Sequence, residues 1–143
     1  MRWRGEIVLT QPTTDKILLA IANDLNAIVL PVVDDEQAKV LLGQIDQLLR
    51  RLSRRSATEI AWMVEEINAI NETLGREGKE VTSLLLADVA AEYSEASGAL
   101  GDAIDEAFAS NDEGMIMKLK NLLSLRIEKE QEILGQLDLV GRG

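Results

Sequence analysis

The stretch that decides the fold is residues 56–74, which read SATEIAWMVEEINAINETL. Its large apolar residues recur at alternating spacings of three and four, which places them on one face of an α-helix rather than on one side of a strand. These residues are Ile60, Met63, Ile67, Ile70 and Leu74. Ser56 and Glu59 have the spacing of a capping box, so we expect a helix to begin at this point.

Two further helices are expected before this stretch. Thr13 is placed to cap the first helix, and Pro31 should end or kink it near Leu30 because proline donates no backbone hydrogen bond. The second should follow the acidic segment 34–37 and carries a stripe made of Ala38, Leu41, Ile45, Leu48 and Leu52. The sequence leaves open whether this helix ends before Ser56 or continues into the next one.

Two helices are also expected after it. Residues 75–80, GREGKE, contain two glycines around charged residues and no recurring apolar position, which is typical of a turn between antiparallel helices. A fourth helix should carry the apolar residues from Leu85 to Ala107, with small residues in its middle. A fifth should follow a capping box at Ser110–Glu113 and extend as far as Leu137.

The chain is therefore predicted to be all-α, a bundle of four or five mostly antiparallel helices. We expect a single domain over residues 1–143, with an extended arm over 1–12 and a frayed tail over 139–143. Aromatic residues make up only 3% of the chain, so leucine, isoleucine, valine and alanine must supply the core. Five amphipathic helices with short connections often leave one apolar stripe uncovered, so we expect self-association, with a homodimer as the default.

Composition excludes several classes of function. The net charge of −10 opposes binding to nucleic acid or to an anionic membrane surface. The chain has no cysteine and no histidine, which excludes disulfides, thiol nucleophiles, imidazole catalysis and the usual zinc sites. The apolar segment Ile7–Leu9 is too short for a signal sequence, and no apolar run is long enough to span a bilayer, so we expect a cytoplasmic protein.

A cluster of four arginines stands out in this acidic chain: Arg50, Arg51, Arg54 and Arg55. On a helix, the first and third lie one turn apart, as do the second and fourth, so the cluster is a candidate site for phosphoryl or CoA-like anions. The alternative is that these arginines neutralise the negative end of the second helix and pair with acidic neighbours.

A cluster of carboxylates is the candidate metal site. Asp88, Glu92 and Glu95 fall on one side of the fourth helix, and their oxygens suit Mg²⁺ or Mn²⁺. The Glu92-x-x-Glu95 pair resembles one of the two pairs that hold Mg²⁺ in the all-α nucleoside triphosphate pyrophosphohydrolases. A second pair at the required separation is missing, because Asp102-x-x-Asp105 follows too soon. A solvated acidic face is the alternative.

Trp62 and its neighbours could line a ligand groove, but the spacing of these residues favours packing against another helix. Residues 12–18, PTTDKIL, and 59–66, EIAWMVEE, resemble segments of uncharacterised bacterial all-helical proteins. Those proteins are associated with aminoglycoside-phosphotransferase-like kinases and acyl-CoA dehydrogenases. The resemblance implies an accessory role near phosphoryl or acyl-CoA chemistry and transfers no catalytic residue.

The function that the sequence favours is that of a non-enzymatic helical interaction or accessory protein, self-associating and able to dock an enzyme partner. No cofactor is expected. Two alternatives remain: a Mg²⁺-dependent nucleotide hydrolase that uses Asp88, Glu92 and Glu95, and a binder of phosphoryl or CoA-like anions that uses the four arginines.

Overall fold

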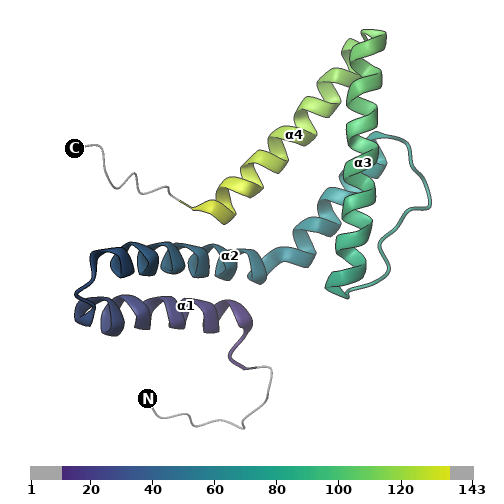
Figure 1. Cartoon of the computed structure of the whole chain (residues 1–143). Coiled ribbons are helices and arrows are strands. Elements are labelled where there is room, and N and C mark those ends of the chain that lie inside the picture. Colours follow the sequence, from purple (N-terminus) through teal and green to yellow (C-terminus); the bar gives the residue numbers. More distant parts are fainter. Residues whose placement is uncertain (1–10, 136–143) are drawn as a thin grey trace. The chain divides into compact units, whose positions relative to one another are not determined.

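The computed structural model describes residues 11–135, which form helices joined by turns, with no strand in this range (Figure 1). The all-α prediction is confirmed. The elements are α1 (Thr14–Asp24), the π-helical turn η1 (Leu25–Val29), the 3₁₀ turn η2 (Leu30–Val32), α2 (Glu36–Thr73), α3 (Leu86–Ser110) and α4 (Glu113–Leu134). Most of the predicted arm and the whole predicted tail, residues 1–10 and 139–143, lie outside the described residues. None of the helices within 11–135 combines the length and the apolar composition that crossing a membrane requires.

The first helix begins where the sequence predicts, but α1 ends at Asp24, six residues before Leu30, and the turns η1 and η2 continue from it. Thr13 has an extended backbone before α1 begins, and helical structure ends at Val32, one residue after Pro31. Pro31 occupies the start of the 3₁₀ turn η2. A backbone N–H at this position has no partner within the turn, so the missing N–H of proline costs no hydrogen bond. The chain then turns back, and α1 lies antiparallel to the first half of α2, with Arg50 bonded to Asn23 and Ser53 to the carbonyl of Asp15 (Figure 1).

The second and third predicted helices are one continuous helix, α2, so the described chain has four α-helices. The sequence leaves open whether a new helix begins at the capping box of Ser56 or the preceding helix continues, and the structure shows that it continues. The Ser56 hydroxyl donates to the carbonyl of Ser53, 3.1 Å away in the preceding turn, and so does not cap a new helix. Ser53 is buried and lies seven residues before Ile60, so one helical face passes through this region without interruption.

Contacts divide the described chain into two compact units. Unit 1 comprises residues 11–57 and 133–135, and unit 2 comprises residues 58–132. The division falls inside α2. The prediction of a single domain stays a prediction, because one helix contributes residues to both units.

Unit 2 contains a hydrophobic core built from α2, α3 and α4. Its buried residues are Met63, Ile67, Ile70, Val89, Ala96, Leu100, Ala107, Leu119 and Leu122. The glycine-rich turn that precedes α3 is where the sequence predicts it, and Gly75 and Gly78 both have positive φ angles, 64° and 76°.

The break between α3 and α4 falls within the predicted capping box, but the N-cap is Asp112, two residues after the predicted Ser110. Asn111, in the left-handed conformation, ends α3. Asp112 then caps α4, because its carboxylate accepts a hydrogen bond of 3.0 Å from the backbone N–H of Met115. Ser110 is the last residue of α3, and its hydroxyl bonds back to the carbonyl of Glu106.

Unit 1 has almost no core. Among its described residues, Ala22 is the one buried hydrophobic residue and Ser53 the one buried polar residue. Large apolar side chains are instead exposed along α1, the turns η1 and η2, and the first half of α2: Ile17, Leu19, Ile21, Ile28, Val29, Val32, Val40, Leu41, Leu48 and Leu52. Burial of apolar surface, the main driving force for folding, is therefore concentrated in unit 2.

A pair of substitutions tests this distribution. Ile70 is fully buried in unit 2, so Ile70→Ala should lower the free energy of unfolding by about 2–5 kcal/mol, through lost burial and the cavity left behind. Ile127 on α4 is 54% exposed, and Ile127→Ala should cost less than about 1 kcal/mol. Urea denaturation of both variants measures the difference, and equal losses would contradict the assignment of the core.

Candidate functional site

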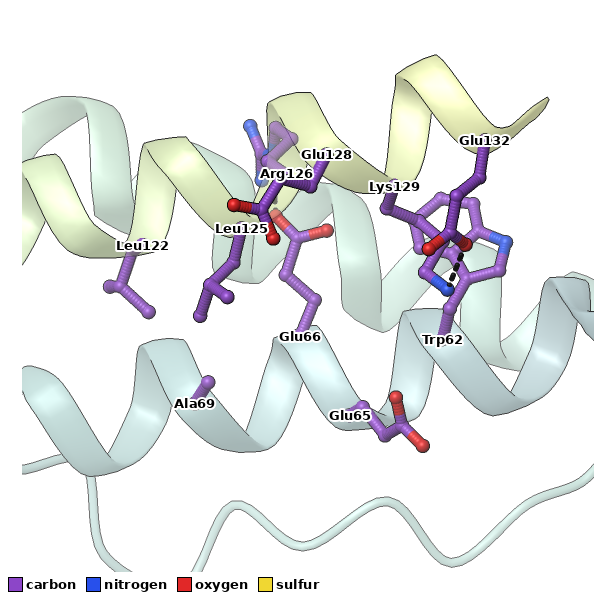
Figure 2. A pocket seen from close by; sticks show the side chains of 10 residues that line it. All are labelled: Trp62, Glu65, Glu66, Ala69, Leu122, Leu125, Arg126, Glu128, Lys129 and Glu132. Atoms are coloured by element: carbon purple, nitrogen blue, oxygen red, sulfur yellow. Dashed lines mark hydrogen bonds and ion pairs between the residues drawn. The ribbon is translucent and has the colours of Figure 1, made fainter. Parts of the chain in front are cut away.

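A pocket of about 290 Å³ lies between the second half of α2 and α4 (Figure 2). Its walls combine apolar and charged side chains from the two helices: Trp62, Glu65, Glu66, Ala69, Leu122, Leu125, Arg126, Glu128, Lys129 and Glu132. Figure 2 shows Leu122 and Leu125 pointing from α4 toward α2, and Ala69 pointing from α2 toward α4. The pocket lies entirely within unit 2.

A network of polar side chains joins three helices beside this pocket. The Glu66 carboxylate, whose side chain is 13% exposed, forms an ion pair with Arg126 and accepts a hydrogen bond of 3.0 Å from the Tyr93 hydroxyl. Arg126 also donates to the Ser97 hydroxyl at 3.0 Å. A buried carboxylate is costly unless its charge is matched, and here a guanidinium group and a phenol satisfy it.

Two aromatic rings extend the network toward the pocket. The guanidinium carbon of Arg126 lies 5.5 Å from the centre of the Tyr93 ring, within the range of a cation–π contact. Trp62 packs against Tyr93 in an edge-to-face arrangement, with ring centres 5.3 Å apart. The indole N–H of Trp62 is buried and has no hydrogen-bond acceptor in the described chain. An unpaired buried donor of this kind costs about 1–3 kcal/mol.

The environment of Tyr93 raises the pKa of its hydroxyl to about 12, from an ordinary value of 10.0. Burial is the largest cause, and the hydrogen bond and negative charge of Glu66 add to it, while the positive charge of Arg126 acts in the opposite direction. Tyr93 therefore remains a neutral hydrogen-bond donor at alkaline pH values where an exposed tyrosine would ionise.

The four predicted anion-binding arginines all lie on α2 but differ in their partners and exposure. Arg50 pairs with Asp46 at 3.0 Å and bonds the side-chain oxygen of Asn23 at 3.1 Å. Arg54 donates to the last two carbonyl oxygens of α4, those of Ile133 and Leu134, at 2.8 Å each. Arg51 is half-buried and Arg55 is exposed.

The alternative role considered for the arginines is correct in one part and wrong in the other. Arg50 does pair with an acidic neighbour, Asp46, but the arginines do not neutralise the end of the second helix. That helix does not end near residue 55, because α2 continues to Thr73. Arg54 instead caps the carboxyl end of a different helix, α4, where cations interact favourably with the unpaired carbonyl groups. The prediction of an anion site stays a prediction, and Arg50 and Arg54 would have to leave these partners to serve it.

The three predicted metal ligands do not form a cation site within the described residues, where no group of three acidic side chains is arranged to hold a metal ion. Asp88 accepts a hydrogen bond of 2.7 Å from Ser83. Glu95 pairs with Lys79 at 2.9 Å and with Arg76 at 2.7 Å, and these two partners lower its pKa.

Glu92 and Glu95 do line a second pocket of about 300 Å³ near the turn before α3. Asn71, which is 8% exposed, also lines it, and its side-chain oxygen is buried without a hydrogen-bond donor. Three carboxylates and two cationic groups line this pocket, and both cations, Arg76 and Lys79, pair with Glu95.

Comparison with known proteins identifies no relative: no family model, no curated protein and no solved structure matches this chain. The site must therefore be interpreted from its own geometry. The sequence pattern pointed to Trp62 and marked Glu66 as one of several helical carboxylates, but it did not indicate that Glu66 meets Tyr93 and Arg126, which lie on two other helices. One signal was present, since Glu66 lies next to the apolar stripe of α2, where an acidic residue is costly unless it is paired.

The Tyr93 network predicts a loss of stability at alkaline pH. Tyr93 is the chain's single tyrosine, so its phenolate absorbance can be titrated without ambiguity. The pKa of Tyr93 is higher in the folded chain than in the unfolded chain. Its contribution to the free energy of unfolding is therefore complete below about pH 10 and is lost as the pH rises toward about 12. Glu66→Gln should lower the midpoint of the Tyr93 titration, though not to the ordinary pKa of 10.0, because the Tyr93 hydroxyl remains partly buried. A midpoint near 10 in the native chain would contradict the network.

The cap formed by Arg54 predicts local fraying. Arg54→Ala should lower the free energy of unfolding by about 1 kcal/mol or less, because the bonds are exposed, and should speed amide exchange in the last turn of α4. Arg51→Ala, with the same loss of charge, is the control. Mass-spectrometric hydrogen exchange reads the terminal segment of α4 directly, and equal exchange in both variants would remove the capping role.

Proposed function

We propose that this chain is a non-enzymatic helical interaction protein that self-associates through unit 1. The observation that carries the proposal is the exposure of large apolar residues on a unit with almost no core. Five of them are more than half exposed and define the association surface: Ile28, Val32, Val40, Leu41 and Leu48. Exposed apolar side chains are ordinary when scattered singly, whereas grouped ones mark sites of association.

Helical geometry supports this use of the surface. Leu41 and Leu48, 56% and 55% exposed, are seven residues apart and therefore lie on the same side of α2. Repeats of this kind pack against a matching stripe on another helix. A second copy of the chain presents the same stripe, and a two-fold symmetric contact would cover both at once.

The distribution of charge also favours unit 1 as the contact. Residues 11–57 contain six acidic and six basic residues, so this segment is neutral, whereas residues 58–132 contain 17 acidic and six basic residues. Two copies that meet through unit 1 therefore avoid the repulsion that two acidic surfaces would experience. The proposal also includes a cytoplasmic location and an enzyme as a second partner, both resting on sequence patterns alone.

Light scattering at micromolar concentration tests the proposal. The native chain should be a dimer or larger, and Leu41→Glu combined with Leu48→Glu should be a monomer, because association would bury two unpaired carboxylates. Since both leucines are more than half exposed, the helical content measured by circular dichroism should be unchanged.

The matched control is Ser124→Glu combined with Gln131→Glu. It adds the same two charges at the same spacing to exposed positions of α4 in unit 2, and it should associate like the native chain. A monomeric native chain, or equal dissociation of both double variants, would refute self-association through unit 1.

A further inference from the structure

The pocket between α2 and α4 has an apolar wall suited to a small hydrocarbon group. Trp62, Ala69 and Leu122 supply this wall, and Leu125, which is 59% exposed, stands at the edge (Figure 2). A volume of about 290 Å³ is at the lower end of the range for small-molecule sites. It would hold one aromatic ring with a short substituent.

The charges around this wall are predominantly negative. Four carboxylates and two cationic groups line the pocket, which leaves a formal charge of −2. Arg126 is bound by Glu66, and Lys129 is bound by Glu132 at 2.7 Å, as the dashed line in Figure 2 shows. Both cations of the pocket are therefore already neutralised by carboxylates of the same pocket.

The two remaining carboxylates of the pocket favour a positively charged ligand over a negatively charged one. Glu65 on α2 and Glu128 on α4 form no ion pair with any residue in the described range 11–135. One comes from each of the two helices that border the pocket. The pKa of Lys129 is raised by its hydrogen bond to Glu132 and also by the charge of Glu65. A positive group on a ligand would gain favourable charge interactions from both, while an anion would meet net repulsion.

We propose that this pocket binds a small organic cation with an apolar body, namely an aromatic or alkyl amine. The hydrocarbon part packs against Trp62 and Leu122, and the ammonium group lies near Glu65 and Glu128. An aromatic ring such as that of Trp62 also attracts a cation placed over its face. This site is separate from the association surface, since all its residues belong to unit 2.

Nuclear magnetic resonance of the indole N–H of Trp62 tests the proposal. The chain has two tryptophans, so Trp3→Phe leaves a single indole signal, and this signal comes from the pocket wall. Three probes of similar shape are compared: phenethylamine, 2-phenylethanol and 3-phenylpropionate. Phenethylamine should shift the signal saturably in the millimolar range, and the neutral and anionic probes should bind at least about threefold more weakly.

Charge variants identify the groups responsible. Glu65→Gln combined with Glu128→Gln should weaken phenethylamine binding about fivefold and reduce its salt dependence, since exposed charge interactions are modest and screened. The matched control, Glu77→Gln combined with Glu130→Gln, removes two exposed carboxylates outside the pocket and should bind like the native chain. A thermal melt confirms that both double variants fold.

Three results would each overturn the proposal. They are an indole signal that does not move with phenethylamine, equal binding of the three probes, or equal weakening in both double variants. The variant with glutamate at positions 41 and 48 should bind phenethylamine normally. Failure of the cation site and failure of self-association are therefore distinguishable.

Discussion

The apolar face on the second half of α2 is the constraint on which unit 2 depends. Ile67 and Ile70, at 2% and 0% exposure, are among its most buried side chains, and the buried residues of α3 and α4 join them in one cluster. Several core positions of α3 are alanines, which allow a neighbouring helix to approach closely. The left-handed residues Gly75 and Asn111 set the chain reversals that return α3 and α4 to this face.

The parts of the fold that follow from periodic burial and from glycine or proline could be predicted from the sequence, whereas the capping boxes at Ser56 and Ser110 gave wrong helix starts. The stripe from Ile60 to Leu74 and the glycine turn after it are both present. The capping-box pattern at Ser56 does not mark a helix start, because its residues are equally compatible with a helix interior. There a serine hydroxyl bonds back to a carbonyl of the preceding turn. The buried face continued through Ser53, and tertiary packing of that face decided against a break.

The site was less predictable than the fold, for a geometric reason. Glu66 reaches Tyr93 across 27 positions of sequence and Arg126 across 60, and each residue comes from a different helix. Helical periodicity tells which residues share a face of one helix, but not how neighbouring helices are aligned along their lengths. The arginine run was conspicuous in the sequence for its density, yet Arg50 and Arg54 bind groups of unit 1.

The hydrophobic core and the association surface of this chain belong to different units. Unit 2 holds the core and an excess of 11 negative charges between residues 58 and 132, while unit 1 is neutral and leaves its apolar side chains exposed. If copies join through unit 1, every added copy also brings another acidic unit 2, and the mutual repulsion of these units grows with the size of the assembly. A two-fold contact covers the association surface of both partners at once and leaves no stripe open for a third copy. Charge and symmetry together therefore favour a closed dimer over a growing polymer.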